Sequence, residues 1–129
     1  MRYGDVLLLK AEALNESAGS TSQAIDLVNQ VRTRARGAGA SPADRDNTIT
    51  DRAQIRQMIM DERLMELAGE GQRWFDLRRW ALGGQITLND AFFDSAIPAD
   101  MGFEDKNLNF PIPTSETNVN PNITQNTGY

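Results

Sequence analysis

Three glutamates at helical spacing are the first candidates for chemistry in this sequence. Glu62, Glu66 and Glu70 are four residues apart, so a helix would line them along one face. Two such carboxylates could serve a glycosidase as its acid and its base. Arginines lie close by in the sequence, however, and their cations would keep both carboxylates ionised, which disfavours the acid role. We therefore favour a structural ion-pair network over an exposed, solvated face and over a catalytic or metal site.

Arginines on both sides of this stripe supply the partners for such a network. Arg63 and Arg73 can each reach a glutamate of the stripe three residues away. Arginines 32, 34 and 36 belong to an earlier helical segment and could face the stripe across a helix pair. We expect the resulting lattice to lock the third helical segment onto the first two. Its expected members are Glu62, Arg63, Glu66, Glu70, Arg73, Asp76 and Arg79.

Five aromatic side chains are the candidates for contact with a ligand such as a sugar. Two tryptophans, six residues apart, would point in different directions from a helix, and core packing is the favoured interpretation of both. An acidic loop over residues 85–106 holds three phenylalanines, and loop aromatics meet ligands more often than helical ones. The ligand-contact candidates are therefore Phe92, Phe93, Phe103, Trp74 and Trp80.

The composition removes several classes of site from this chain. Its 129 residues include no cysteine and no histidine, which excludes disulfides, thiolate or histidine metal sites and Ser-His-Asp triads. We expect no cofactor. The net charge of -5 disfavours nucleic acid as a partner, because phosphate binding needs a basic face. The longest aliphatic run, residues 6–9, is far shorter than the about 20 apolar residues of a membrane span.

Two amphipathic segments open the chain and predict a helical hairpin over residues 1–37. Apolar side chains recur at helical spacing in residues 3–18. Ser20 offers an N-cap to a second helix, which is expected to stop at Gly37. The two helices together have the length of a tetratricopeptide (TPR) unit, although any antiparallel helical hairpin fits the same pattern.

Residues 53–82 predict a third helical segment. Within it Met60, Leu64 and Leu67 follow helical spacing and are expected to share one apolar face. The two glycines of Gly69–Gly71 lie inside the segment, and each costs about 1 kcal/mol relative to alanine in a helix interior. We therefore expect a kink, or two abutting helices, at this point.

The last part of the chain differs in kind from the helical segments. Residues 83–129 carry one basic and six acidic groups, so the whole net charge of -5 resides there. They show little periodicity and predict an irregular tail, while residues 38–52 predict a shorter loop. The predicted fold is all-α, with a TPR-like helix hairpin, a long kinked third helix and a long irregular C-terminal loop region.

Three motifs in a fixed order resemble the C-terminal region of the SusD/RagB family. The first is RYGDVLLLKAEALNE at residues 2–16, with AIDLVNQVRTRA at residues 24–35. The second, ERLMELAGEGQRWFDLRRW at residues 62–80, resembles the family pattern ER-x-x-EL-x-x-EG-x-R-x-x-DL-x-R-W. The third comprises the proline and asparagine turns of residues 111–121 and the ending QNTGY, where Thr127 replaces the usual proline. The resemblance covers nearly the whole chain.

This resemblance implies a function in nutrient uptake. Members of the family are non-catalytic lipoproteins of the outer membrane that bind glycans or other nutrients and partner a SusC-like TonB-dependent transporter. The resemblance therefore implies that the ligand is an oligo- or polysaccharide and that the protein is exposed at the cell surface. It also implies a larger N-terminal part, with the lipid anchor, that is absent from this sequence.

Two other functions remain open from the residues themselves. A TPR-like hairpin could act as a protein–protein interaction module through its helical face. A glycoside hydrolase using Glu62 and Glu66 is the least favoured interpretation. A hairpin without neighbouring repeats would also expose apolar surface, so a homodimer of this fragment is a further expectation.

Overall fold

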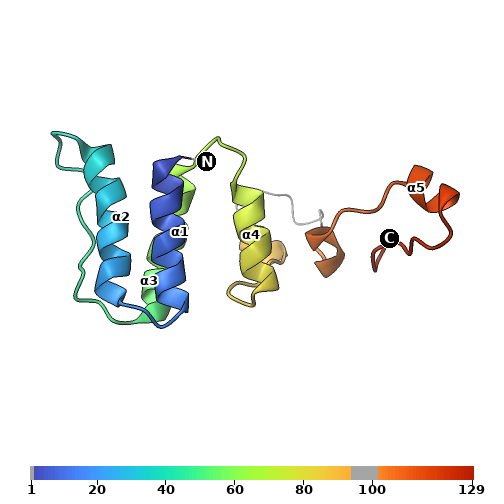
Figure 1. The fold of residues 1–129 in the computed structure, drawn as a ribbon, viewed down its shortest axis with the longest axis horizontal. Coiled ribbons are helices and arrows are strands. Elements are labelled where there is room, and N and C mark those ends of the chain that lie inside the picture. The colour runs from blue at the N-terminus through green and yellow to red at the C-terminus, as the bar shows by residue number, and fades with distance from the viewer. Residues whose placement is uncertain (1, 94–101) are drawn as a thin grey trace. The chain divides into compact units, whose positions relative to one another are not determined.

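Every regular element that the structure describes is a helix. The computed structural model describes residues 2–93 and 102–129 (Figure 1). The predicted all-α class is thereby confirmed for the described residues, while residues 94–101 of the expected acidic loop lie outside them. The chain divides into two compact units, Met1–Arg73 and Trp74–Tyr129. The elements are α1 (Tyr3–Glu16), α2 (Thr21–Arg36), α3 (Arg52–Glu66), α4 (Arg73–Leu82), the 3-10 helices η1 (Asp90–Phe93) and η2 (Asp105–Leu108), and α5 (Thr114–Val119).

Helices α1 and α2 form the expected hairpin, and local sequence signals set its boundaries. Ser20 is the N-cap of α2, and its side-chain oxygen accepts a hydrogen bond from the backbone N–H of Gln23 at 3.3 Å. A cap of this kind satisfies one of the free N–H groups of the first turn. Gly37 ends the helix at a φ of 56°, in the left-handed region that favours glycine.

Helix α3 packs against both helices of the hairpin and completes the first unit (Figure 1). The core between the three helices is aliphatic, and its members are almost inaccessible to water. Burying one such side chain contributes about 1.5–3 kcal/mol, so this cluster is the main source of stability of the unit. The core residues are Leu7, Leu8, Ala11, Ala24, Ile25, Leu27, Val28, Val31, Ile55 and Ile59.

The inward face of α3 differs from the one expected from its apolar spacing. Leu64 is 48% exposed, so the expected placement of this residue on a common apolar face is wrong. Met60 is buried as its spacing predicts, and the other buried positions of the last two turns are the charged residues Glu62 and Arg63. These charged side chains point inward because each forms an ion pair with a residue on another helix, Arg32 of α2 or Asp5 of α1. Leu67 is buried as expected, although it lies just beyond the helix end.

The third helical segment is broken into two helices, one of the two outcomes expected at its glycines. Helix α3 ends at Glu66 and α4 begins at Arg73. Between them Gly69 and Gly71 adopt φ values of 77° and 72°. Residues with a Cβ are strained in this region of φ, so the two glycines permit the turn that separates the helices.

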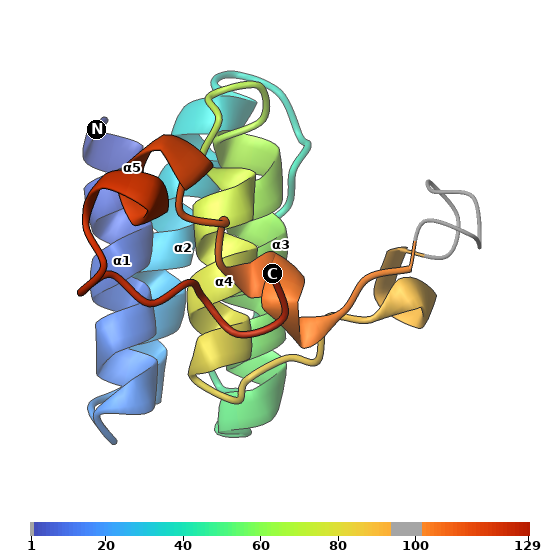
Figure 2. The same cartoon turned by 90° about the vertical axis from the view of Figure 1, so that its right-hand side faces the viewer.

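The second unit contains α4, the short helices η1, η2 and α5, and long irregular connections. The expected irregular region thus includes three short helical segments within its described residues. The C-terminal residues return to η2, as Figure 2 shows. Because this unit has few regular backbone ladders, its backbone groups need side chains as hydrogen-bond partners.

Candidate functional site

An aromatic cluster in the second unit brings together four of the five ligand-contact candidates. The ring centroids of Trp74 and Phe103 lie 6.4 Å apart in an edge-on arrangement. Phe93 lies 5.3 Å from Phe103 and 5.2 Å from Phe92. These separations are those of favourable aromatic pairs, so the four rings form one continuous group. We call Trp74, Phe92, Phe93 and Phe103 the aromatic cluster.

The cluster is assembled from three separate parts of the chain. Trp74 lies in the first turn of α4, and the neighbouring phenylalanines end η1. The backbone N–H of Phe103 donates to the Asp90 carboxylate at 2.6 Å, which ties the third part to η1. Phe92 keeps 42% of its surface exposed, so part of the cluster faces water. Such a surface can pack against an apolar ring face of a bound molecule.

Trp80 lies apart from the cluster and is closed to ligands. It is 1% exposed, which rules out a stacking contact between its indole and a sugar in this structure. The Arg79 guanidinium lies 4.9 Å from the centre of the Trp80 ring, a favourable cation–π arrangement. We therefore assign Trp80 to packing within the structure.

The glutamate stripe of α3 meets arginines of α2 and of the segment before α1. Glu62 accepts from Arg32 at 2.5 Å. Glu66 is held by two guanidinium groups, since one carboxylate oxygen accepts from Arg2 at 2.7 Å and the other from Arg34. The Glu66 side chain is only 6% exposed, so water does not compete freely for it. Two of the three facing arginines expected from sequence thus contact the stripe.

Glu70 extends the stripe beyond the helix. It lies 2.5 Å from the Arg2 guanidinium, and this hydrogen bond lowers the pKa of the Glu70 carboxyl below its ordinary value. The same contact, with that to Glu66, raises the pKa of Arg2. Arg36 does not face the stripe but pairs with Asp44 in the following loop at 2.9 Å.

A buried ion pair joins α3 to α1. Arg63 donates to the Asp5 carboxylate at 2.9 Å, and the Arg63 side chain is 3% exposed. This partner differs from the intrahelical glutamate expected for Arg63. A guanidinium at such depth needs an acidic partner, because desolvating an unpaired charge costs several kcal/mol.

The remaining expected lattice members lie in α4. Asp76 and Arg79 pair within that helix at 3.1 Å. The contact is made within one helical turn. Arg2 joins Glu66 and Glu70 into one group. Glu62 and Arg63 instead pair with Arg32 and Asp5 on the other two helices. Asp76 and Arg79 pair within α4, which begins at Arg73.

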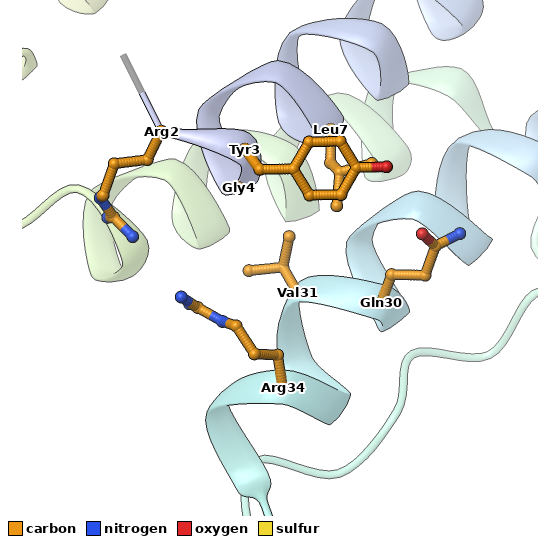
Figure 3. A pocket seen from close by; sticks show the side chains of 7 residues that line it. All are labelled: Arg2, Tyr3, Gly4, Leu7, Gln30, Val31 and Arg34. Carbon is orange, nitrogen blue, oxygen red and sulfur yellow. The ribbon is translucent and has the colours of Figure 1, made fainter.

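A pocket of about 360 Å³ opens beside the network, between α1 and α2 (Figure 3). Leu7 and Val31 supply its apolar lining, and the exposed ring of Tyr3 lies beside them. Arg2 and Arg34 stand at its edge, and both are engaged by Glu66. Gly4 and Gln30 complete the lining.

Neither a metal site nor a membrane helix is found among the described residues. Across residues 2–93 and 102–129, no three acidic side chains gather as metal ligands would. Within the same ranges, no helix has the length and apolarity needed to cross a membrane.

Several functional contacts could not be found from sequence patterns. Arg2 and Asp5 had no role in the expected lattice because their partners lie 64 and 58 residues away. At the opposite end of the hairpin, the Arg52 side chain donates to the backbone carbonyls of Asn15 at 2.6 Å and Gly19 at 2.8 Å. No local pattern identifies this contact, because Arg52 begins α3 and lies 37 and 33 residues from these carbonyls in the sequence.

Comparison with known proteins gives one consistent result. The whole chain, residues 1–129, matches the model of the SusD family. SusD-like protein P2 of Formosa agariphila is 36% identical over 100% of this chain and 25% of its own length. The starch-binding protein SusD of Bacteroides thetaiotaomicron is 31% identical over 99% of this chain and 21% of its own length. A crystal structure of a SusD homolog from Bacteroides thetaiotaomicron has a TM-score of 0.78 at 30% identity, covering 100% of this chain and 26% of that one.

Proposed function

We propose, because this chain belongs to the SusD family, that it forms part of a non-catalytic protein that binds nutrient glycans. The main support for the proposal is the match of the full chain to the family model. A second support is the 31% identity to a relative that is named for starch binding. The chain spans about a quarter of the length of the curated relatives it matches. We therefore propose glycan binding for the protein to which these residues belong.

The partner in this proposal is a SusC-like TonB-dependent transporter, and the location is the outer surface of the outer membrane. Resemblance to the family supports both. Co-purification of the transporter with a tagged, membrane-anchored protein containing these residues is the expected result. Recovery of the tagged protein without any transporter would contradict the partnership.

The state of the acidic stripe supports binding over hydrolysis. Arginines engage both Glu62 and Glu66 in the packed interior of the first unit. A glycosidase needs two carboxyl groups that face a sugar cleft, whereas the oxygens of these glutamates accept from guanidinium groups in the packed interior. We therefore assign these glutamates to the scaffold.

Within the chain, we assign sugar contact to the aromatic cluster. A pyranose ring presents C–H groups on its faces, and these pack well on aromatic rings. Trp74 offers the largest ring, and Phe92 is exposed whereas Phe93 and Phe103 are half-buried. The Asp90 carboxylate, which lies at the cluster beside Phe103, has further lone pairs that can accept hydrogen bonds from sugar hydroxyls.

Affinity gel electrophoresis against soluble polysaccharides tests this assignment. Circular dichroism first confirms that the chain is folded, and amylopectin, laminarin and alginate are then cast into native gels. We expect at least one polysaccharide to retard the chain. Trp74→Ala should weaken this interaction about fivefold to tenfold, since a lost aromatic contact is worth about 1 kcal/mol or more.

A matched control is available on the same helix. Phe75 is 65% exposed and is not a member of the aromatic cluster, so Phe75→Ala should leave the retardation unchanged. Failure of a folded wild-type chain to be retarded by any of the polysaccharides would contradict the assignment of the sugar site. Equal losses in Trp74→Ala and Phe75→Ala would contradict the role of the cluster.

The pocket between α1 and α2 supports a second candidate function, that of a TPR-like protein-interaction module. Its apolar lining from Leu7 and Val31 could receive a side chain of a protein partner. This function predicts partner binding that Tyr3→Ala, a change at the exposed edge of the pocket, weakens and that Trp74→Ala does not change. The glycan-binding function predicts the reverse for retardation by a polysaccharide.

A further inference from the structure

The last five residues turn back onto residues 103–112, a stretch that contains η2 and otherwise has irregular backbone. The side-chain amide of Gln125 pairs with both backbone groups of Ile112, accepting from its N–H at 2.8 Å and donating to its carbonyl at 2.8 Å. This two-bond contact reproduces the pairing that a neighbouring strand would make. Gln125 therefore fixes the far end of the stretch.

Two more side chains of the ending bind carbonyls earlier in the same stretch. Asn126 donates to the carbonyl of Phe110 at 2.7 Å. The hydroxyl of Tyr129 lies 3.0 Å from the carbonyl of Asn109 and 3.2 Å from that of Lys106, so its one proton is shared between them. We call Gln125, Asn126 and Tyr129 the C-terminal clasp.

Gly128 allows the clasp to close. Its φ is 96°, and a Cβ at this position would lie 2.8 Å from the Cβ of Lys106. Any larger residue would meet both a backbone penalty and a collision. The glycine and the three polar side chains therefore act together in the ending QNTGY.

The stretch held by the clasp leads directly to the aromatic cluster. On its other side, Arg78 of α4 donates to the carbonyl of Leu108 at 2.5 Å and to the side chain of Asn109 at 2.6 Å. The stretch begins at Phe103, whose ring lies against Trp74 and Phe93. Irregular backbone of this kind keeps its position only if its polar groups find such partners.

We infer that the C-terminal clasp consists of positioning residues, which hold residues 103–112 so that Phe103 stays packed in the aromatic cluster. The part of this inference that concerns ligands rests on the proposed function. Without the clasp, the stretch would lose five hydrogen bonds to its backbone, and Phe103 would sample other positions. Ordering it again on binding a sugar would then reduce the affinity.

The chain contains only two tryptophans, which gives a direct spectroscopic test. The full chain labelled with 5-fluorotryptophan should give two fluorine resonances, and Trp74→Phe assigns them. Tyr129→Phe and Gln125→Ala should each shift or broaden the Trp74 resonance. The Trp80 resonance should stay in place, because that ring is buried in its own packing site. Thr127→Ala, in the middle of the clasp, is the matched control and should move neither resonance.

Retardation by the three polysaccharides completes the test. The clasp variants should weaken binding about twofold to tenfold, the cost of ordering one or two side chains again. An unchanged Trp74 resonance in the Tyr129→Phe, Gln125→Ala double variant would overturn the positioning role. A shifted resonance with unchanged polysaccharide binding would overturn its link to the ligand. If the wild-type chain binds none of the polysaccharides, the proposed sugar site fails, while the fluorine spectra still decide the positioning role.

Discussion

Replacing Asp5 by asparagine tests the buried ion pair of the first unit most sharply. Asp5→Asn keeps the size of the side chain but removes the charge that faces Arg63. Since the Arg63 side chain is 3% exposed, its cation would remain in the interior without its acidic partner on α1. Removing one partner of a buried pair costs about 3–5 kcal/mol. Asparagine can still accept one hydrogen bond, so we expect the lower end, about 3 kcal/mol.

Urea denaturation followed by circular dichroism at 222 nm measures this change, because most of the helical residues lie in the first unit. The control is Asp44→Asn, which breaks an ion pair whose carboxylate is 52% exposed. An exposed pair contributes less than about 1 kcal/mol, so this variant should unfold close to the wild type.

A double variant separates the loss of this ion pair from the cost of keeping the Arg63 charge buried without Asp5. Asp5→Leu with Arg63→Met replaces both charges by apolar groups, a change that is often neutral or stabilising. We expect the double variant to be within about 1 kcal/mol of the wild type. If Asp5→Asn and Asp44→Asn lowered the free energy of unfolding by the same small amount, burial would not make the Asp5–Arg63 pair more stabilising than the exposed Asp44–Arg36 pair.

Four further outcomes follow from the contacts described above. Glu66→Ala should cost about 2 kcal/mol in urea denaturation, less than a fully buried pair, because its partner Arg34 is 59% exposed and regains water. The hydrogen bond from Arg2 lowers the pKa of the Glu70 carboxyl. The stability that this ion pair adds to the fold is therefore complete above the ordinary pKa of 4.5 and is lost as the pH falls through the lowered pKa. The difference in stability between wild type and Glu70→Gln should shrink only at acidic pH. Ser20→Ala removes the α2 cap and should lower the free energy of unfolding by about 1 kcal/mol. Gly128→Ala should increase hydrogen exchange of the amides in residues 103–112, and unchanged exchange there would contradict the close approach to Lys106.

Local signals made the helical hairpin predictable from sequence. Ser20 and Gly37 mark the start and end of α2 through interactions with their own neighbours, which a pattern of residue types captures. The glycines at positions 69 and 71 likewise marked the break between α3 and α4. What they could not decide was whether the helix would bend or separate, because the turn geometry depends on positive φ at both positions.

Long-range partners account for what the sequence did not predict. The apolar spacing of α3 placed Leu64 inward, but the partners Asp5 and Arg32 draw Arg63 and Glu62 to the buried positions instead. Nothing local identifies those partners, since they lie on other helices. The same limit applies to the aromatic cluster, because Trp74 and Phe103 lie in contact although they are far apart in the sequence.

The ending of the chain shows a related limit. Its residue types resemble a family motif, yet the motif alone does not say what the side chains bind. In the structure all three clasp residues bind backbone groups, which no pairing of side-chain types would reveal. The binding partners of QNTGY can therefore be identified only once the position of residues 103–112 is known.

The most direct test of the central claim is a fluorine-detected titration of the wild-type chain labelled with 5-fluorotryptophan. An oligosaccharide prepared from the polysaccharide that retards the chain is added stepwise, and the two tryptophan resonances are followed. If the aromatic cluster contacts the sugar, the Trp74 resonance shifts in a saturable manner and the buried Trp80 resonance does not. Binding that leaves the Trp74 resonance unchanged would contradict the claim that this cluster is the glycan site.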